Sequence, residues 1–323
     1  MLNRREFLAA TGSAVLVPKV VSGETTPSTL PTSANAPPLV LAATEQLMYS
    51  TVKLLNQERT RWGTGFLFSL FRQGDNHVPV VVTNKHVVEA LGDECVFSLT
   101  SRMPDGSPDL QNHVQIEVTD FKRSWIPHPD ADLAVFPIAK PMDEIGRKGH
   151  PAFAVTLNGT LIPTDVQFKE LLPVEQILTV GFPGGLWDNV HNLPVFHRGY
   201  TATAPYINFQ GRREFLIDIT TWFGSSGSPV LLFNDGPWLD RNGVTNEGGV
   251  RLKLIGIICA VAVEDVSGNV RIEKEPTEGY ARGNLSVPIN LGVCINASRI
   301  LEFEPIFVSR GYQPPAGYKM RAQ

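Results

Sequence analysis

Cysteine is scarce in this 323-residue sequence, which contains only Cys95, Cys259 and Cys294. Three thiols without a Cys-x-x-Cys pair exclude a disulfide-rich scaffold and provide no zinc or redox motif. We therefore expect buried free thiols and no cofactor. A bridge between Cys259 and Cys294 stays open, because it depends on whether their strands pair.

An excess of positive over negative charge is also lacking. With a net charge of −4 and an isoelectric point near 6.0, the chain has no basic stripe that could hold a phosphate backbone, so nucleic acid is not an expected partner. The apolar stretch Phe7–Val17 is too short to span a bilayer, so stable membrane insertion is not expected either. A composition of 42% hydrophobic and 19% charged residues instead fits a globular protein of one large domain or two modest ones.

The N-terminus carries an export pattern. Arg4 and Arg5 directly precede the apolar stretch, and the run resembles the twin-arginine signal of bacteria. We expect residues 1–23 to be this signal, cleaved after Gly23 and not after Ala36, because Pro37 would follow the second cut. An amphipathic N-terminal helix is the alternative. Residues 24–42 are rich in Pro, Ser and Thr and form a linker. The expected location is the periplasm or the outside of a bacterial cell.

Helical periodicity is rare, whereas short β-branched and aromatic runs ended by Gly, Pro, Asn or Asp recur throughout, as is typical of many short strands. The first group of six expected strands is Met48–Leu55, Gly63–Phe71, Pro79–Thr83, Cys95–Leu99, Val114–Phe121 and Asp132–Ile138. The second group is Gln176–Phe182, Val195–Ala204, Glu214–Thr220, Pro229–Phe233, Leu252–Val263 and Leu285–Ile295. Asn296 is expected to cap a closing helix.

Two groups of six antiparallel strands predict an all-β fold of two closed or nearly closed barrels with a short C-terminal helix, because closure removes exposed sheet edges. The cleft between the barrels is the natural position for a site. The domain boundaries are an N-terminal barrel over 43–141, a connection over 142–170, a C-terminal barrel with its helix over 171–304, and a tail over 305–323 that is too short for a recognition domain. Residues 264–284 are expected to be a surface loop.

The stretch Gly224–Pro229 places three serines on a glycine-flanked turn. A nucleophilic hydroxyl needs such a turn, because its oxygen must be exposed while backbone N–H groups converge on the oxyanion it creates. Ser226 is the candidate nucleophile, and the N–H groups of Gly224 and Ser226 are the candidate oxyanion hole. Ser225 and Ser228 would support the turn. A structural turn between two strands is the alternative interpretation.

Two further signals lie in the first group of strands. His86 follows a β-branched strand, where a general base is held by the scaffold and faces a cleft. Asp132 precedes another apolar strand, where a carboxylate can orient an imidazole. Asp130 competes for this role. Metal binding by His128, Asp130 and Asp132 lacks a matching ligand set elsewhere in the chain.

The order His86, Asp132, Ser226 places base and carboxylate in the first group of strands and nucleophile in the second. An α/β-hydrolase is excluded, because its histidine follows the nucleophile and all seven histidines here precede Ser226. A subtilisin-like order would need an earlier aspartate, and Asp75 is a poor candidate. No His-Glu-x-x-His occurs, which excludes that metalloprotease class.

Over residues 48–301 the chain resembles the chymotrypsin-fold serine peptidases, in particular the compact bacterial trypsin-like group that includes the HtrA peptidases. The shared motifs, in order, are GTGFLF, VTNKHVV, DLAVF, VGFPGG, GSSGSP, LIGII and LGVCINASRIL. The resemblance implies two chymotrypsin-like barrels and a serine endopeptidase that acts on proteins or peptides. In it Ser226 attacks the scissile carbonyl, His86 accepts the proton, Asp132 orients the imidazole, and an acyl enzyme forms.

Two departures refine what the resemblance implies. Digestive members carry an aspartate just before the nucleophile that pairs with a newly cut N-terminus; Ser225 stands there, so activity should not depend on such a cut. Thr220 occupies the base of the primary pocket, and Ala260, Val261 and Ala262 form its wall, which favours small or medium apolar side chains over Lys or Arg. Two alternatives remain: a catalytically inactive double-barrel binding protein, and a serine hydrolase dedicated to esters or to one partner. The oligomeric state is left open.

Overall fold

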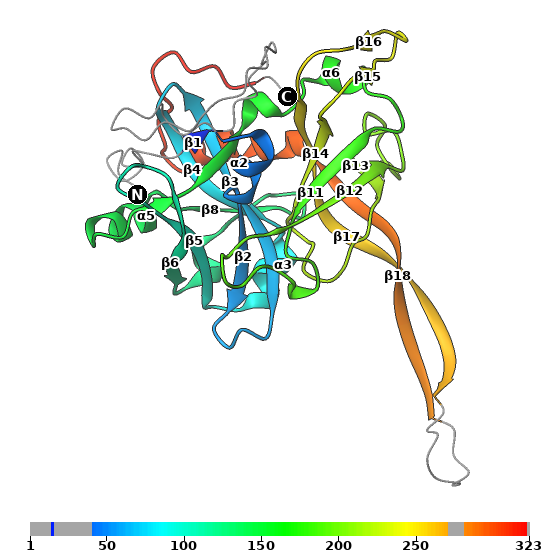
Figure 1. Cartoon of the computed structure of the whole chain (residues 1–323), viewed down its shortest axis with the longest axis horizontal. Helices are drawn as coiled ribbons and strands as arrows, with labels where there is room; N and C mark the ends of the chain where they lie inside the picture. Colours follow the sequence, from blue (N-terminus) through cyan, green and yellow to red (C-terminus); the bar gives the residue numbers. More distant parts are fainter. Residues whose placement is uncertain (1–13, 16–40, 271–280, 322–323) are drawn as a thin grey trace, which may run out of the picture.

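The computed structural model describes residues 14–15, 41–270 and 281–321 (Figure 1). The expected export signal and linker lie outside the described residues, except for Ala14–Val15 and residues 41–42. Strand β1 (Ala14–Val15) pairs in parallel with β10 (Val155–Asn158). In the described part of the chain, no helix has the length and apolarity needed to cross a membrane.

The first group of strands forms a ten-stranded sheet in the order β6-β5-β2-β3-β4-β8-β7, with β9 paired to β5 and β10 paired to β3. Besides β1 and β10, its strands are β2 (Thr51–Asn56), β3 (Trp62–Gln73), β4 (Asn76–Thr83), β5 (Cys95–Arg102), β6 (Pro108–Val118), β7 (Ile126–Pro127), β8 (Ala134–Pro137) and β9 (Ala152–Phe153). The first expected strand begins at Thr51 and not at Met48, because Ala43–Met48 forms helix α2. The segment 142–170, expected as a connection, contributes β9 and β10 to this sheet.

Strand β3 is buried on both faces along Phe66–Phe71, which explains why five of these six residues are apolar. Successive side chains of a strand point to opposite faces. Phe66 and Phe68 therefore join a core shared with the second group of strands, while Leu67 joins the core inside the first sheet. Strand β4 divides in the same way, with Val80 in the shared core and Val81 in the other. The two halves of the molecule are consequently packed as one body.

The second group forms a closed six-stranded barrel in the order β11-β12-β13-β18-β17-β14. Its strands are β11 (Gln176–Gly181), β12 (Val195–Thr201), β13 (Glu214–Asp218), β14 (Pro229–Asn234), β17 (Arg251–Val270) and β18 (Ala281–Asn296). A separate pair, β15 (Trp238–Leu239) and β16 (Thr245–Asn246), lies between β14 and β17 in the chain. The all-β, chymotrypsin-like fold of a closed barrel, a second sheet and a short C-terminal helix is confirmed.

The prediction of a surface loop over 264–284 was wrong for residues 264–270 and 281–284, while residues 271–280 lie outside the described residues. Strands β17 and β18 stay paired well beyond the barrel, from Val263 opposite Pro288 to Val270 opposite Ala281, and Figure 1 shows them projecting from the molecule as a long hairpin. The segment is interpreted as a loop because its sequence is charged and contains glycine. Such a sequence fits a paired two-stranded ribbon as well as a loop.

The helices are short and peripheral. Besides α2 they are α3 (Lys85–Leu91), α4 (Phe121–Ser124), α5 (Ala139–Arg147), α6 (Asp165–Lys169), α7 (Phe303–Ser309) and the 3-10 turns η1 (Gly159–Leu161), η2 (Pro183–Gly185) and η3 (Ala297–Glu302). The expected closing helix begins as η3 and continues as α7. The Asn296 side chain caps it by accepting the N–H of Ser298 at 2.9 Å.

The closing helix joins both halves. Ile300 and Phe303 are fully buried in the shared core. The Glu304 carboxylate, itself buried, accepts the backbone N–H of Phe71 in β3 at 3.0 Å and the hydroxyl of Tyr318 at 2.7 Å. Burial raises the pKa of the Glu304 carboxyl, although these two hydrogen bonds oppose the shift. Helix α7 and Tyr318 are therefore hydrogen-bonded to the first sheet through the Glu304 carboxyl, whose pKa is raised.

Glu304→Gln should change the pH dependence of stability. A raised carboxyl pKa means that its contribution to the free energy of unfolding is complete below the unfolded value of 4.5 and is lost as the pH rises through the folded value. The variant keeps a neutral acceptor, so its stability should gain on the parent as the pH rises from about 4 to about 7. Urea denaturation across this range measures the difference. Parallel profiles for the two proteins would contradict the prediction.

Candidate active site

The Gly224–Pro229 turn connects β13 to β14 and exposes one of its serines. Ser225 and Ser228 are buried at 5% and 2% exposure, whereas Ser226 is only half-buried. Gly224 and Gly227 have φ angles of 93° and 88°, in the region that favours glycine. A Cβ atom on Gly227 would lie 1.9 Å from the Thr64 carbonyl oxygen, so the turn depends on glycine here for space as well as for conformation.

The backbone of this turn leaves two N–H groups available. Those of Ser225, Gly227 and Ser228 donate to carbonyl oxygens, at 2.9, 2.8 and 3.0 Å. Within the described residues, the N–H groups of Gly224 and Ser226 donate to no protein acceptor. Preorganised free donors beside an accessible hydroxyl are what the stabilisation of an oxyanion requires.

Thr64 in β3 holds the turn in place, a role that the sequence reasoning missed. Its N–H donates to the Ser226 carbonyl at 3.0 Å, and its hydroxyl donates to the Gly224 carbonyl at 2.8 Å. The same hydroxyl accepts the N–H of Phe182 at 3.1 Å. Thr64, between the two glycines of GTGF, was the available sequence signal for this role, but only the folded structure places it beside the Gly224–Pro229 turn.

His86 lies in the first turn of α3 and contacts Asp132. Its Nδ1 is 2.6 Å from Asp132 Oδ2, and its backbone N–H donates to Oδ1 at 3.1 Å. Asn84, the residue before α3, donates its amide to the Asp132 carbonyl at 2.8 Å. A proton on Nδ1 that is donated to the carboxylate leaves Nε2 free to accept another. Asp130 is 77% exposed and lies near Arg299 instead, so the structure places Asp132 at the histidine.

The segments that carry Ser226 and His86 are both hydrogen-bonded to Thr64 of β3, although among the described residues no hydrogen bond joins the two side chains. Thr83, three residues before His86, donates its hydroxyl to the Thr64 carbonyl at 2.7 Å, and Thr64 in turn donates to Ser226. The nucleophile turn and the histidine segment are therefore anchored to one residue of β3.

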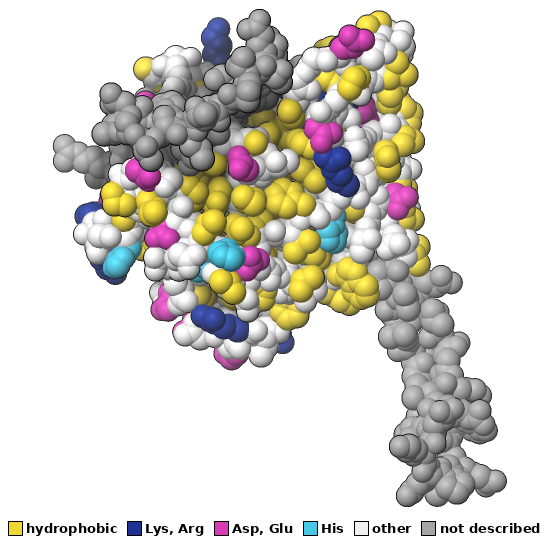
Figure 2. All heavy atoms as spheres, viewed as in Figure 1, with side chains coloured by type: hydrophobic (Ala, Val, Ile, Leu, Met, Phe, Trp, Pro, Cys, Tyr) yellow, Lys and Arg dark blue, Asp and Glu magenta, His cyan; other side chains and the backbone are white. Residues whose placement is uncertain are grey.

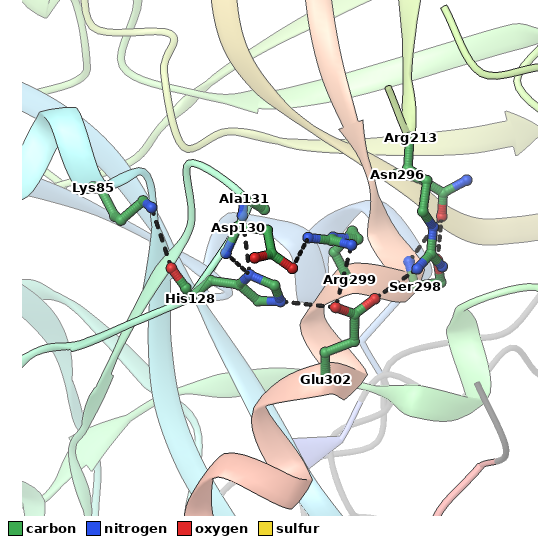
Figure 3. A network of polar contacts seen from close by, with 9 residues as sticks. All are labelled: Lys85, His128, Asp130, Ala131, Arg213, Asn296, Ser298, Arg299 and Glu302. Carbon is green, nitrogen blue, oxygen red and sulfur yellow. Dashed lines mark hydrogen bonds and ion pairs between the residues drawn. The ribbon is translucent and has the colours of Figure 1, made fainter. Parts of the chain in front are cut away.

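A buried histidine supports the loop that carries Asp132 (Figure 3). His128, with a fully buried side chain, accepts the N–H groups of Asp130 and Ala131 on Nδ1 at 3.1 and 3.0 Å. A nitrogen that accepts two N–H groups carries no proton, so Nε2 holds the proton and donates it to Glu302 at 2.9 Å. Lys85, next to His86, donates to the His128 carbonyl at 3.1 Å.

Glu302 connects His128 to residues of the second barrel. It accepts Arg213 of the residues just before β13 at 2.6 Å and Arg299 of η3 at 3.3 Å (Figure 3). Burial alone would raise the pKa of the Glu302 carboxyl, but the His128 hydrogen bond and the two arginines outweigh it and lower the pKa. The His128 ring is thus fully used in protein contacts. No cluster of three potential metal ligands occurs in the part of the chain that the structure describes, so the metal interpretation of His128, Asp130 and Asp132 gains no support.

The residues expected to form the pocket come from two sides. Thr220 is exposed, and its carbonyl faces Nδ1 of His197 at 2.9 Å. Ala260 is exposed and Val261 and Ala262 are half-buried on β17, where the pairing with β18 shifts twice. Val261 lies opposite Gly292, and a Cβ atom on Gly292 would lie 3.3 Å from the Thr221 side chain. Gly292 of β18 therefore lies beside both Val261 and Thr221, the residue that follows Thr220.

The thiols offer no competing nucleophile. All three cysteines are free in the structure. Burial raises the pKa of Cys95 and Cys259 to about 12 and that of Cys294 well above its usual value. Each therefore stays protonated near neutral pH, and the accessible hydroxyl of Ser226 is the better candidate.

The fold is that of the chymotrypsin-like serine peptidases. Residues 63–238 match the family model described as "Trypsin-like peptidase domain", and the chain belongs to this family. A search of curated proteins gives no match. The predicted resemblance to the trypsin-like and HtrA group is confirmed at the level of the family.

Several solved structures are similar in fold. Deg5 has 18% identity and a TM-score of 0.36, with 67% of this chain and 81% of that chain covered. Rv3671c from M. tuberculosis H37Rv, a serine-to-alanine mutant in its inactive form, has 14% identity and a TM-score of 0.38, with 88% and 100% covered. The thermostable serine protease AL20 from an extremophilic microorganism has 12% identity and a TM-score of 0.41, with 83% and 99% covered.

His128→Ala should destabilise the Asp132 loop, because the part-buried N–H groups of Asp130 and Ala131 lose their acceptor. The expected loss in free energy of unfolding is roughly 2 kcal/mol, at ~1 kcal/mol for each lost hydrogen bond. His128→Asn should recover much of this loss, since an amide oxygen can reach the Nδ1 position. Urea denaturation measures both variants. Equal stability of the two variants would contradict the role assigned to Nδ1.

Proposed function

We propose that this protein is a serine endopeptidase that uses Ser226, His86 and Asp132 as its catalytic residues. The observation that carries the proposal is the 2.6 Å contact between His86 Nδ1 and Asp132 Oδ2, which leaves His86 Nε2 as the free basic atom of the ring. The half-buried Ser226, the least buried serine of its turn, and the two free N–H groups beside it support the proposal. Membership of the trypsin-like family supports a peptide substrate.

The chemistry proceeds through a covalent intermediate. The Ser226 oxygen attacks the scissile carbonyl carbon while His86 Nε2 takes the hydroxyl proton, and the N–H groups of Gly224 and Ser226 receive the negative oxygen. Collapse breaks the carbon–nitrogen bond, and His86 returns the proton to the leaving amine. Water then repeats the sequence on the acyl ester and releases the acid. Asp132 holds the imidazole tautomer and stabilises its cation at each step.

The proposed specificity is for small or medium apolar side chains. Thr220 brings no carboxylate to the base of the pocket, and the wall residues Ala260, Val261 and Ala262 are small or apolar. A cationic side chain buried there would lack a partner. Serine at position 225 supports activity that is independent of a newly cut N-terminus.

We also propose that the protein is exported from a bacterial cytoplasm, on the strength of the Arg4-Arg5 run before an apolar stretch. Labelling of the Ser226 hydroxyl in separated cytoplasmic and external fractions checks the location. Labelled protein confined to the cytoplasm would contradict it.

Ser226→Ala should abolish labelling by a fluorophosphonate probe, because the probe reacts with an activated serine hydroxyl. His86→Ala should slow labelling on the order of 10³-fold or more. Ser309→Ala, which removes an exposed hydroxyl on α7, is the matched control and should label like the parent. Gel fluorescence after a timed reaction measures the rates. A folded parent that never labels would favour the inactive binding protein.

Cleavage of a matched peptide series should show at least about tenfold higher kcat/KM after Ala or Val than after Lys or Arg. Thr220→Asp should narrow or reverse this ratio by placing a carboxylate at the base of the pocket. Steady-state kinetics on peptides that differ only at the residue before the cut provide the ratio. Preferred cleavage after Lys or Arg by the parent would overturn the proposed specificity.

A further inference from the structure

The most prominent projection of the molecule is a two-stranded ribbon, called here the arm. It consists of residues 263–270 of β17 paired in continuous register with residues 281–288 of β18 (Figure 1). Within the described residues no third strand pairs with it. Both outer edges of the arm therefore carry backbone N–H and C=O groups without strand partners, which is a surface that accepts a further strand.

One of these edges leads directly to the Ser226 turn. On the barrel, β17 pairs with β14 up to Ile257 opposite Pro229. The next residue, Ile258, donates its N–H to the Ser228 carbonyl at 3.0 Å and accepts the N–H of Gly227 at 2.8 Å. From residue 259 to residue 270 this edge of β17 has no described strand beside it. The open edge of β17 thus begins at residue 259, directly after the last contacts between β17 and the residues that follow Ser226.

The direction of β14 fixes how a bound peptide would run. Strand β14 is antiparallel to β17 and starts just after Ser226. A peptide that continues the line of β14 along the open edge is also antiparallel to β17, the more stable arrangement. Its C-terminal end then lies at the Ser226 turn, and its N-terminal end points along the arm. The open edge spans residues 259–270, about 40 Å at ~3.3 Å per residue.

We propose that the arm binds the substrate: an unfolded, extended polypeptide adds as a strand to the open edge of β17, with about ten residues on the N-terminal side of the bond to be cut. This inference rests on the proposed peptidase function. Recognition through backbone groups accepts many sequences but requires an extended chain. The substrate class is therefore unfolded protein segments or long peptides, and tetrapeptides use only the first part of the edge.

The position of the edge favours a substrate over a second copy of this chain. The open edge is continuous with the turn that carries the candidate nucleophile, whereas pairing between two arms would need no such continuity. A two-stranded ribbon is marginally stable by itself in water, and a third strand stabilises it. Substrate binding would therefore order the arm as it delivers the chain to Ser226.

Peptide length and arm length test the proposal together. The probes are fluorescein-labelled peptides of four, seven and ten residues, built from Ala, Thr and Val and ending in Ala. In the shortened variant, Asn-Gly replaces residues 266–285 and joins Asp265 to Ser286, which lie opposite each other, through a two-residue turn. Binding is measured by fluorescence anisotropy in the Ser226→Ala background, so that it does not depend on catalysis.

Affinity should rise at least about tenfold from four to ten residues with the full arm, because each added pair of backbone hydrogen bonds contributes. The shortened variant keeps residues 259–265 of the edge, so it should bind the tetrapeptide equally well, keep the rise from four to seven residues and lose the further rise to ten. Single N-methyl groups placed along the ten-residue peptide should weaken binding at alternate positions, since alternate N–H groups of a strand face one edge.

Two results would overturn the proposal: affinity independent of peptide length, or an N-methyl scan without alternation. Loss of a dimer in the shortened variant, seen by sedimentation with peptide binding unchanged, would assign the arm to a second copy instead. Failure of the proposed peptidase function is recognised separately, as absence of fluorophosphonate labelling in the parent.

Discussion

The contact between Gly227 and the Thr64 carbonyl joins the two halves of this protein at its candidate site. A Cβ atom at position 227 would overlap the carbonyl oxygen, so glycine alone lets the turn approach β3 this closely. Thr64 uses its N–H, carbonyl and hydroxyl to hold the Ser226 turn on one side and Thr83 on the other. Ser226 and His86, the proposed nucleophile and base, lie on different halves, and Thr64 contacts the segments that carry both.

A second connection fixes the carboxylate. Asp132 lies on a loop of the first sheet, but the loop is held by His128, and His128 is held by Glu302 of η3 and through it by Arg213 of the second barrel. The buried imidazole of His128 supports this loop, because its Nδ1 accepts two of the loop's backbone N–H groups. Both halves of the molecule thus position the residue that orients His86. The shared apolar core beneath them keeps the two connections in register.

The sequence predicted the strands well because their signal is local. β-branched and aromatic runs ended by turn residues marked six of the ten strands of the first sheet and all six strands of the closed barrel, and the Asn296 cap marked the closing helix. The arm was missed because its charged, glycine-containing sequence also fits a loop, and within the described residues its strands pair only with each other. The first strand was predicted to begin three residues too early, because Met48 and Tyr49 are apolar, although Met48 belongs to helix α2.

The candidate site divides in the same way. The chain by itself determined the glycine-flanked serine turn, the histidine after a buried strand and the aspartate before another, because each is a short pattern with one local conformation. Only the tertiary structure decided that Asp132 and not Asp130 meets the imidazole, that Ser226 is the accessible serine, and that Thr64 and His128 support them. These choices depend on contacts between residues far apart in sequence, and local patterns carry no information about which distant groups packing will bring together.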